Sequence, residues 1–193
     1  MRKLKRVALA AALTATTVVG LAAVGAAANA KTATAGHGTQ PVTASWAGSE
    51  PAAVAANERV VQAFLRDVID EHHGDHAARY LTQNMQWHGG TVGTVTGRDN
   101  VAGLFAGVVA SLPNAHAAVK DIFGQGNEVV VRLVVSGTQE GTLLGIPPSG
   151  RNIHWDAVDI FRLEGGKISA IWAGDDWSAI LYYTGTFTPP WIH

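Results

Sequence analysis

The chain has 193 residues, of which 47% are hydrophobic and 15% charged, with a formal net charge of −1 and no cysteine. This length is sufficient for one hydrophobic core of ordinary depth. The lack of cysteine excludes disulfides, thiol nucleophiles and Cys-based metal sites, so a packed core must supply the stability.

The first 30 residues have the pattern of a cleavable signal peptide. Four cations within the first six residues precede residues 7–28, which are uncharged and rich in Ala, Val and Leu. The pattern ends in Ala28-Asn29-Ala30, a small-x-small cleavage motif. A retained membrane anchor is the alternative, because the stretch can just span ~30 Å of hydrocarbon, but no basic stop-transfer cluster follows it. We therefore predict cleavage near Ala30 and a protein secreted to the cell envelope or medium, without stable membrane insertion.

Cleavage would leave ten Lys and Arg against 15 Asp and Glu, a net charge of −5. This acidic balance, without a basic stripe, argues against a nucleic-acid partner. Residues 31–49 mix Thr, Ala, Gly and Ser without periodicity, which predicts a flexible spacer. Residues 50–193 remain for a single folded domain.

Helical patterns occupy the first half of this domain. Apolar residues recur at i, i+3, i+4, i+7 and i+8 over 61–69, which predicts a helix with one buried face. A second, short helix is expected over 75–81 and a brief strand over 85–88. A third helix is expected from Arg98 to about Ser111, because Pro113 prevents its continuation.

The periodicity changes from 3.6 to 2 in the second half. Strands are predicted at 119–123 and 129–135 around one Gly-containing turn, and at 153–163 and 167–173 around another. Helices followed by hairpins indicate an α+β domain in which a curved antiparallel sheet wraps around the first helix. Such a cone has a pocket at its mouth.

Strand alternation places two aspartates near apolar faces. Asp159 belongs to the apolar, odd-numbered set of strand 153–163. Asp176 follows the even-numbered set of the last strand, which includes Trp172, if alternation continues past Gly174. Burial raises the pKa of a carboxyl towards the range useful for proton transfer. A buried Asp that is simply hydrogen-bonded is the alternative, but two that converge on one cavity favour a site, so we predict a raised pKa for Asp176.

The histidines are weaker candidates. His72, His73 and His76 lie at and just after the end of the first predicted helix. Gly74 is expected to break the helix between His72 and His76, so no metal site is predicted there. His88 is either a hydrogen-bond donor or base at the pocket, or a plain edge histidine.

Several motifs carry a family resemblance. Residues 137–151 read GTQEGTLLGIPPSGR, and shorter motifs occur at 85–89, 97–99, 159–162 and 166–168. The first of these resembles the G-T-H-x-G-x-x-x-G-I-P-P-T-G-R signature of SnoaL-like polyketide and ester cyclases, and the others are similar to further family elements in the same order. The resemblance spans about residues 57–185.

This resemblance implies the cone-shaped α+β barrel of the nuclear transport factor two-like superfamily, often a homodimer through the open sheet face. It also implies acid–base catalysis without metal or cofactor, in which an intramolecular aldol condensation closes a ring in a polyketide ester. We predict acid–base chemistry of this type on a small apolar carbonyl compound. Asp176 would be the general acid and base, and His88 and Asp159 would line the pocket and either hydrogen-bond the enolate or orient Asp176. The apolar walls of the ligand pocket would be Trp87, Trp155, Trp172 and Phe161.

Some family positions hold less polar residues here. Trp87 replaces an acid before His88, Gln139 replaces a histidine, and Ala170-Ile171 replaces Glu-His. These differences leave two alternatives: a pocket that binds an apolar ligand without reacting, and dehydratase, isomerase or epoxide hydrolase chemistry on the same scaffold.

Overall fold

A computed structural model describes residues 51–192 of the chain. The predicted signal peptide (1–30) and spacer (31–49) lie outside the described residues. Within the described range, no helix has both the length and the apolar character needed to cross a bilayer.

The predicted helices of the first half are present. Helix α1 (Pro51–Phe64) runs directly into the π-helical segment η1 (Leu65–Asp70), and the 3-10 helix η2 (Gly74–Arg79) follows after a reversal of the chain. The apolar face predicted over 61–69 is buried. Helix α2 (Arg98–Ser111) has the bounds expected from its sequence.

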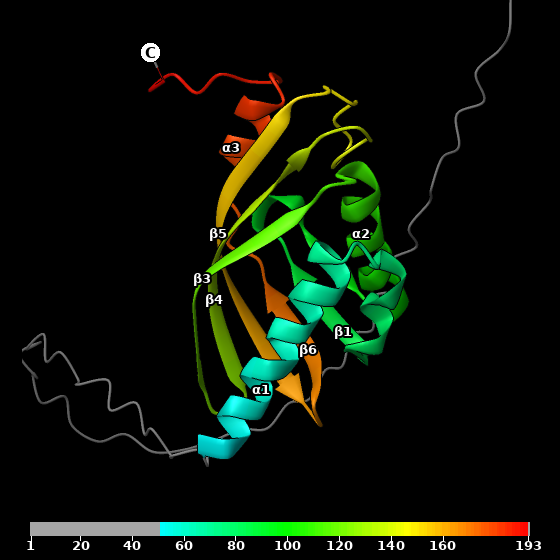
Figure 1. The fold of residues 1–193 in the computed structure, drawn as a ribbon, viewed down its shortest axis with the longest axis vertical. Helices are drawn as coiled ribbons and strands as arrows, with labels where there is room; N and C mark the ends of the chain where they lie inside the picture. The colour runs from blue at the N-terminus through cyan, green and yellow to red at the C-terminus, as the bar shows by residue number, and fades with distance from the viewer. Residues whose placement is uncertain (1–50, 193) are drawn as a thin grey trace, which may run out of the picture. The chain divides into compact units, whose positions relative to one another are not determined.

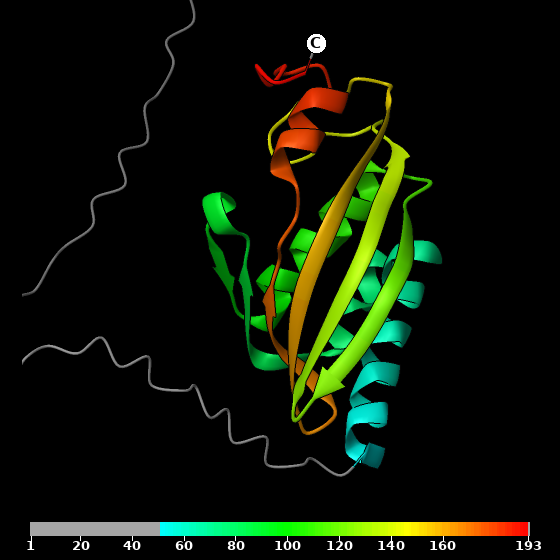
Figure 2. The same cartoon turned by 90° about the vertical axis from the view of Figure 1, so that its left-hand side faces the viewer.

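Two short helical segments were not predicted. One is the 3-10 turn η3 (Gly90–Val92), and the other is helix α3 (Trp177–Tyr183) near the C-terminus. Helix α3 packs at the end of the sheet beside the segment 139–151, as Figure 2 shows.

Six strands form one curled sheet in the order β2-β1-β6-β5-β4-β3. Their bounds are β1 (Leu81–His88), β2 (Thr94–Thr96), β3 (His116–Gln125), β4 (Glu128–Thr138), β5 (Asn152–Glu164) and β6 (Lys167–Trp172). The two predicted hairpins are β3–β4 and β5–β6. In the second, Gly165 and Gly166 both have positive φ (57° and 75°), as a tight two-residue turn requires. One pairing departs from the predicted antiparallel arrangement, because β1 and β6 run parallel.

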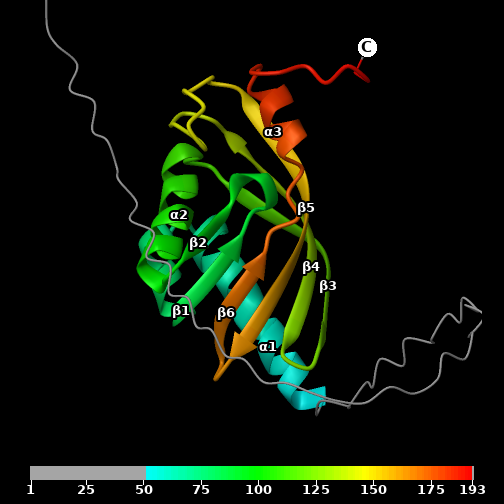
Figure 3. The same ribbon diagram turned by 180° about the vertical axis from the view of Figure 1, so that it is seen from behind.

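The sheet curls around α1 and α2, which cover its concave face (Figure 1). Figure 3 shows β1 and β2 beside α2 at one edge of the sheet. The edge strands β2 and β3 do not pair with each other, so the sheet stays open and does not close into a barrel. Phe64 lies in the core between helices and sheet, with its ring edge-on to those of Tyr80, Phe105 and Phe161 at centroid distances of 5.7, 5.0 and 6.3 Å. The predicted α+β cone is therefore confirmed.

A bulge in β6 determines which residues face the interior beyond it. Leu163 pairs with Ile168, but Arg162 pairs with Ala170, so Ser169 is an extra residue without a partner in β5. One extra residue reverses the alternation of every side chain that follows. Inward positions in this strand therefore change from even to odd numbers, which decides the composition of the site.

Candidate active site

A cavity of about 90 Å³ lies between the concave face of the sheet and the helices. Its walls are aromatic and aliphatic, and Asp159 and Asp175 are the charged residues that line it. Aromatic side chains come from five elements, α1, β1, α2, β5 and α3: Phe64, Trp87, Phe105, Trp155, Phe161 and Trp177. Leu143 and Leu144 of the 139–151 segment also line it. An apolar cavity with two polar groups is typical of a small-molecule site.

Asp159 lies in the middle of β5 on the inward face, as alternation predicted. Its Oδ1 accepts the backbone N–H of Gly174 at 3.0 Å. Burial raises the pKa of Asp159 to about 8, the nearby charge of Asp175 contributes to this increase, and the Gly174 hydrogen bond opposes both. Asp159 is therefore largely protonated at neutral pH.

Asp175 follows β6 and forms an isolated antiparallel bridge with Ala157 of β5. The indole Nε1–H of Trp155 donates to Asp175 Oδ1 at 2.6 Å. Burial raises the pKa of Asp175, and this hydrogen bond opposes the shift because it stabilises the carboxylate. Asp159 and Asp175 thus share one apolar cavity and titrate as a pair.

Close packing of the backbone holds the two carboxyls together. A Cβ atom on Gly174 would lie 2.4 Å from the carbonyl oxygen of Val158, so only glycine fits there without a shift. This close approach lets the Gly174 N–H reach Asp159 and brings Asp175 opposite Ala157.

The structure contradicts two expectations for Asp176. Its side chain does not line the cavity and instead caps α3, accepting the backbone N–H groups of Ser178 at 3.0 Å and Ala179 at 3.1 Å. The hydrogen bond from the Ser178 side chain, with those from the backbone, lowers the pKa of Asp176, so the predicted increase is wrong. The bulge at Ser169 explains the error, because it turns the odd-numbered Asp175 inward.

His88 and Trp172 lie together outside the cavity. Their rings stack at a centroid distance of 5.4 Å, His88 Nδ1 lies 3.2 Å from Thr94 Oγ1, and the guanidinium of Arg162 lies 4.7 Å from the centre of the Trp172 ring. Neither side chain is in position to contact a ligand in the cavity. The other predicted wall residues, Trp87, Trp155 and Phe161, do line it.

Sequence reasoning missed Asp175 and Trp177. An available signal was the capping preference of aspartate, since Asp176 precedes the segment Trp177–Tyr183 and N-cap positions favour Asp. Assigning Asp176 to the cap would have left Asp175 as the candidate for the pocket.

Comparisons with known proteins identify the family and the fold. Residues 59–182 match the family model of the SnoaL-like polyketide cyclases. A search of curated proteins found no match.

Solved structures with the same fold cover most of both chains. A protein from Jannaschia sp. CCS1 assigned to the SnoaL-like polyketide cyclases has a TM-score of 0.63 and 22% identity, over 73% of this chain and 99% of its own. TsrD from Streptomyces laurentii has a TM-score of 0.61 and 23% identity, over 69% and 97%. An LEH-like epoxide hydrolase from M. tuberculosis has a TM-score of 0.57 and 13% identity, over 68% and 91%. At these identities the likeness shows the fold alone.

Proposed function

Because the chain belongs to the SnoaL-like polyketide cyclase family, we propose that it is an enzyme performing acid–base chemistry on a small apolar carbonyl compound. The observation that carries this proposal is the pair Asp159 and Asp175, two carboxyls with raised pKa at one apolar cavity. Such pairs are characteristic of sites that transfer protons at neutral pH.

The two carboxyls have different roles in this proposal. The Trp155 hydrogen bond stabilises the charged form of Asp175, whereas Asp159, with a pKa of about 8, retains its proton at neutral pH. In the singly protonated pair, Asp175 is therefore the base and Asp159 the acid.

The proposed reaction begins with the Asp175 carboxylate removing a proton from the carbon next to a carbonyl. Asp159 donates a hydrogen bond to the oxygen on which negative charge develops, which stabilises the enolate in the low-dielectric cavity. In an aldol-type ring closure, the enolate carbon attacks a second carbonyl of the same molecule. The resulting alkoxide takes the proton from Asp175, which restores the starting state. Asp175 carries out both proton transfers, so the proposed reaction requires no cofactor.

Proton abstraction can be tested separately from ring closure. We propose to incubate the protein with α-tetralone, an apolar ketone, in D2O and to follow loss of its α-proton signal by NMR. Asp175→Asn should slow the exchange at least ~100-fold, because general-base catalysis contributes about that much. Asp156→Asn, an exposed residue of the same strand as Asp159, is the matched control and should exchange at the wild-type rate.

The alternative function is binding of an apolar ligand without turnover, favoured by the almost wholly apolar lining of the cavity. It would be supported if ketone resonances broaden equally with wild-type protein and Asp175→Asn while neither accelerates exchange. Isomerase chemistry begins with the same proton abstraction and would pass the exchange test. Epoxide hydrolysis, the activity for which one structural neighbour is named, instead needs a carboxylate to activate water, and the protein would then consume an apolar epoxide without exchanging ketone protons.

A further inference from the structure

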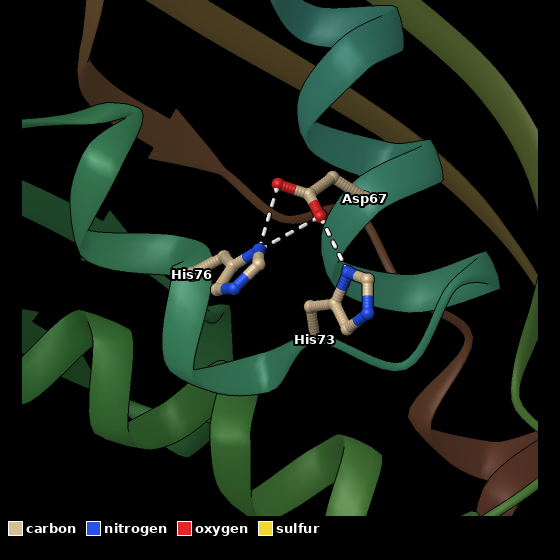
Figure 4. A group of neighbouring side chains, drawn as sticks. All are labelled: Asp67, His73 and His76. Atoms are coloured by element: carbon tan, nitrogen blue, oxygen red, sulfur yellow. Dashed lines mark hydrogen bonds and ion pairs between the residues drawn. The ribbon is translucent and has the colours of Figure 1, made fainter.

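A second cluster of polar side chains lies at the end of the first helix, away from the cavity. Asp67 belongs to η1, His73 immediately precedes η2, and His76 belongs to η2. The chain reverses at His72, which has a positive φ of 60°, so that η2 folds back along η1. Figure 4 shows both imidazoles turned towards the Asp67 carboxylate.

The distances in this cluster are short enough for one ion to bridge it. Asp67 Oδ1 lies 2.8 Å from His73 Nδ1 and 3.0 Å from His76 Nδ1. The candidate ligand atoms of the three residues all lie within 4.8 Å of one another. Ligands at about 2.0–2.2 Å from a zinc ion are themselves roughly 3–3.5 Å apart, so only small side-chain movements are needed.

Neighbouring groups hold the carboxylate in place and leave the cluster open to solvent. The Tyr80 hydroxyl donates to Asp67 Oδ2 at 2.8 Å, the type of outer hydrogen bond that orients metal-binding carboxylates. Asp75 lies close to the far nitrogen of His76, with Oδ2 4.0 Å from Nε2. The side chain of His73 is 48% exposed, so an ion can enter and water can complete its coordination.

We propose that Asp67, His73 and His76 form a binding site for a divalent transition-metal ion of the Zn²⁺ type. Two imidazoles and one carboxylate are a donor set that suits zinc and its neighbours, whereas Ca²⁺ and Mg²⁺ favour all-oxygen sites. The ion replaces the protons that now link the rings to the carboxylate. The third histidine of this stretch, His72, takes no part, because its Nε2 is directed to the carbonyl oxygen of Ala115.

The bound ion has a structural role. Leu65 and Ile69 of η1 line the cavity, but Asp67 does not. An ion held by residues of η1 and η2 therefore fixes the fold-back between these segments and does not contact a ligand in the cavity. This inference is independent of the proposed catalytic function.

Metal titration tests the site directly. The full chain, carrying no polyhistidine tag and stripped with EDTA, would be titrated with Zn²⁺ by calorimetry and with Co²⁺ by visible absorption. We expect one Zn²⁺ per chain, and a d–d absorption band when Co²⁺ binds. His73→Ala and His76→Ala should each weaken binding at least ~10-fold, and saturating Zn²⁺ should raise the Tm of the wild-type protein by several degrees.

His116→Gln is the matched control. His116 also pairs with an aspartate, its Nδ1 lying 3.0 Å from Asp70 Oδ1, but no second histidine joins that pair among the described residues. The control should bind Zn²⁺ as the wild type does. If His76→Ala melts in EDTA at a much lower temperature than the wild type, its weaker binding could reflect unfolding. The Zn²⁺ affinity of His73→Ala, in which an exposed side chain is removed, then decides whether the site exists. The proposal is overturned if millimolar Zn²⁺ fails to bind, or if His116→Gln weakens binding as much as His73→Ala.

Discussion

Asp159 illustrates how one buried carboxyl couples function to stability. Its pKa of about 8 in the folded protein lies far above the ordinary value of 3.8. Between these values the folded state binds the proton more tightly than the unfolded state does. Stability contributed by the protonated form is therefore fully present at low pH and is lost as the pH rises towards 8.

Asp159→Asn should remove this pH dependence. The amide cannot ionise, and its oxygen can still accept the Gly174 N–H. At pH 9 we expect the variant to be more stable than the wild type by a few kcal/mol, since each pKa unit corresponds to about 1.4 kcal/mol. The difference should disappear near pH 4. Thermal melts across this range measure it, and a difference that does not vary with pH would contradict the assignment.

Asp176 provides the complementary test at the residue scale. Asp176 is the N-cap of α3, so Asp176→Ala should lower the free energy of unfolding of the protein by about 1 kcal/mol. Asp176→Asn should lower it much less, because Asn is also a good cap. Denaturant unfolding measures both changes. We expect the ketone exchange rate of Asp176→Asn to stay within a few-fold of the wild type, in contrast to Asp175→Asn. A hundred-fold loss would instead assign the catalytic role to Asp176.

At the scale of elements, the sequence patterns correctly predicted the features that depend on local periodicity. The buried face of the first helix, the bounds of α2 and both hairpins follow from apolar spacing, Pro113 and paired glycines. Asp159 precedes the register shift in β5, which lies between Arg162 and Leu163, so alternation correctly predicted that its side chain faces inward. Asp176 lies seven residues beyond the Ser169 bulge, which depends on pairing with β5 and has no local signature. The parallel pairing of β1 with β6 is also non-local and was not predicted.

The close packing of the segment after β6 against β5 depends on Gly174. Gly174→Ala places a methyl group 2.4 Å from the Val158 carbonyl oxygen, so the two segments must separate. We expect a loss of about 1–3 kcal/mol, in the range of overpacking substitutions, together with slower ketone exchange because the Gly174 N–H and Asp175 move. Unfolding and exchange assays measure the two effects.

Gly103→Ala is the control for this substitution. Gly103 lies in α2, and apart from its chain neighbours and the backbone of its own helix, no atom lies within 4 Å of the position that a Cβ would occupy. Alanine should therefore stabilise that helix by up to about 1 kcal/mol. Equal effects of the two substitutions would contradict the packing argument for Gly174.

At the scale of the whole molecule, the N-terminal pattern bears on where the protein acts. We propose that the chain is exported and cleaved after Ala30. Intact-mass measurement of protein recovered from the medium or cell envelope of its host should give a mature chain beginning at Lys31. A chain that retains residues 1–30 in the membrane fraction would support the anchored alternative. An exported enzyme of this type would meet its carbonyl substrate outside the cytoplasm.

The outer face of the sheet, on the side opposite the helices, carries an apolar row. Phe123, Val130, Ile160 and Trp172 lie side by side on β3, β4, β5 and β6 by strand register. Phe123 is 59% exposed, and Val158 in the adjacent row is 51% exposed. Large exposed side chains that are contiguous across strands are typical of an interaction surface.

We propose that this row is the interface of a homodimer, because a second copy offers the same apolar row to cover it. Light scattering coupled to size exclusion should give twice the chain mass at micromolar concentration. Phe123→Glu should produce monomers, because it would bury a carboxylate in an apolar interface. Gln62→Glu, which adds the same charge on an exposed position of α1, should leave the dimer intact. The interface is wrong if Phe123→Glu remains dimeric, and dimerisation itself is excluded if the wild type is monomeric at 100-fold higher concentration.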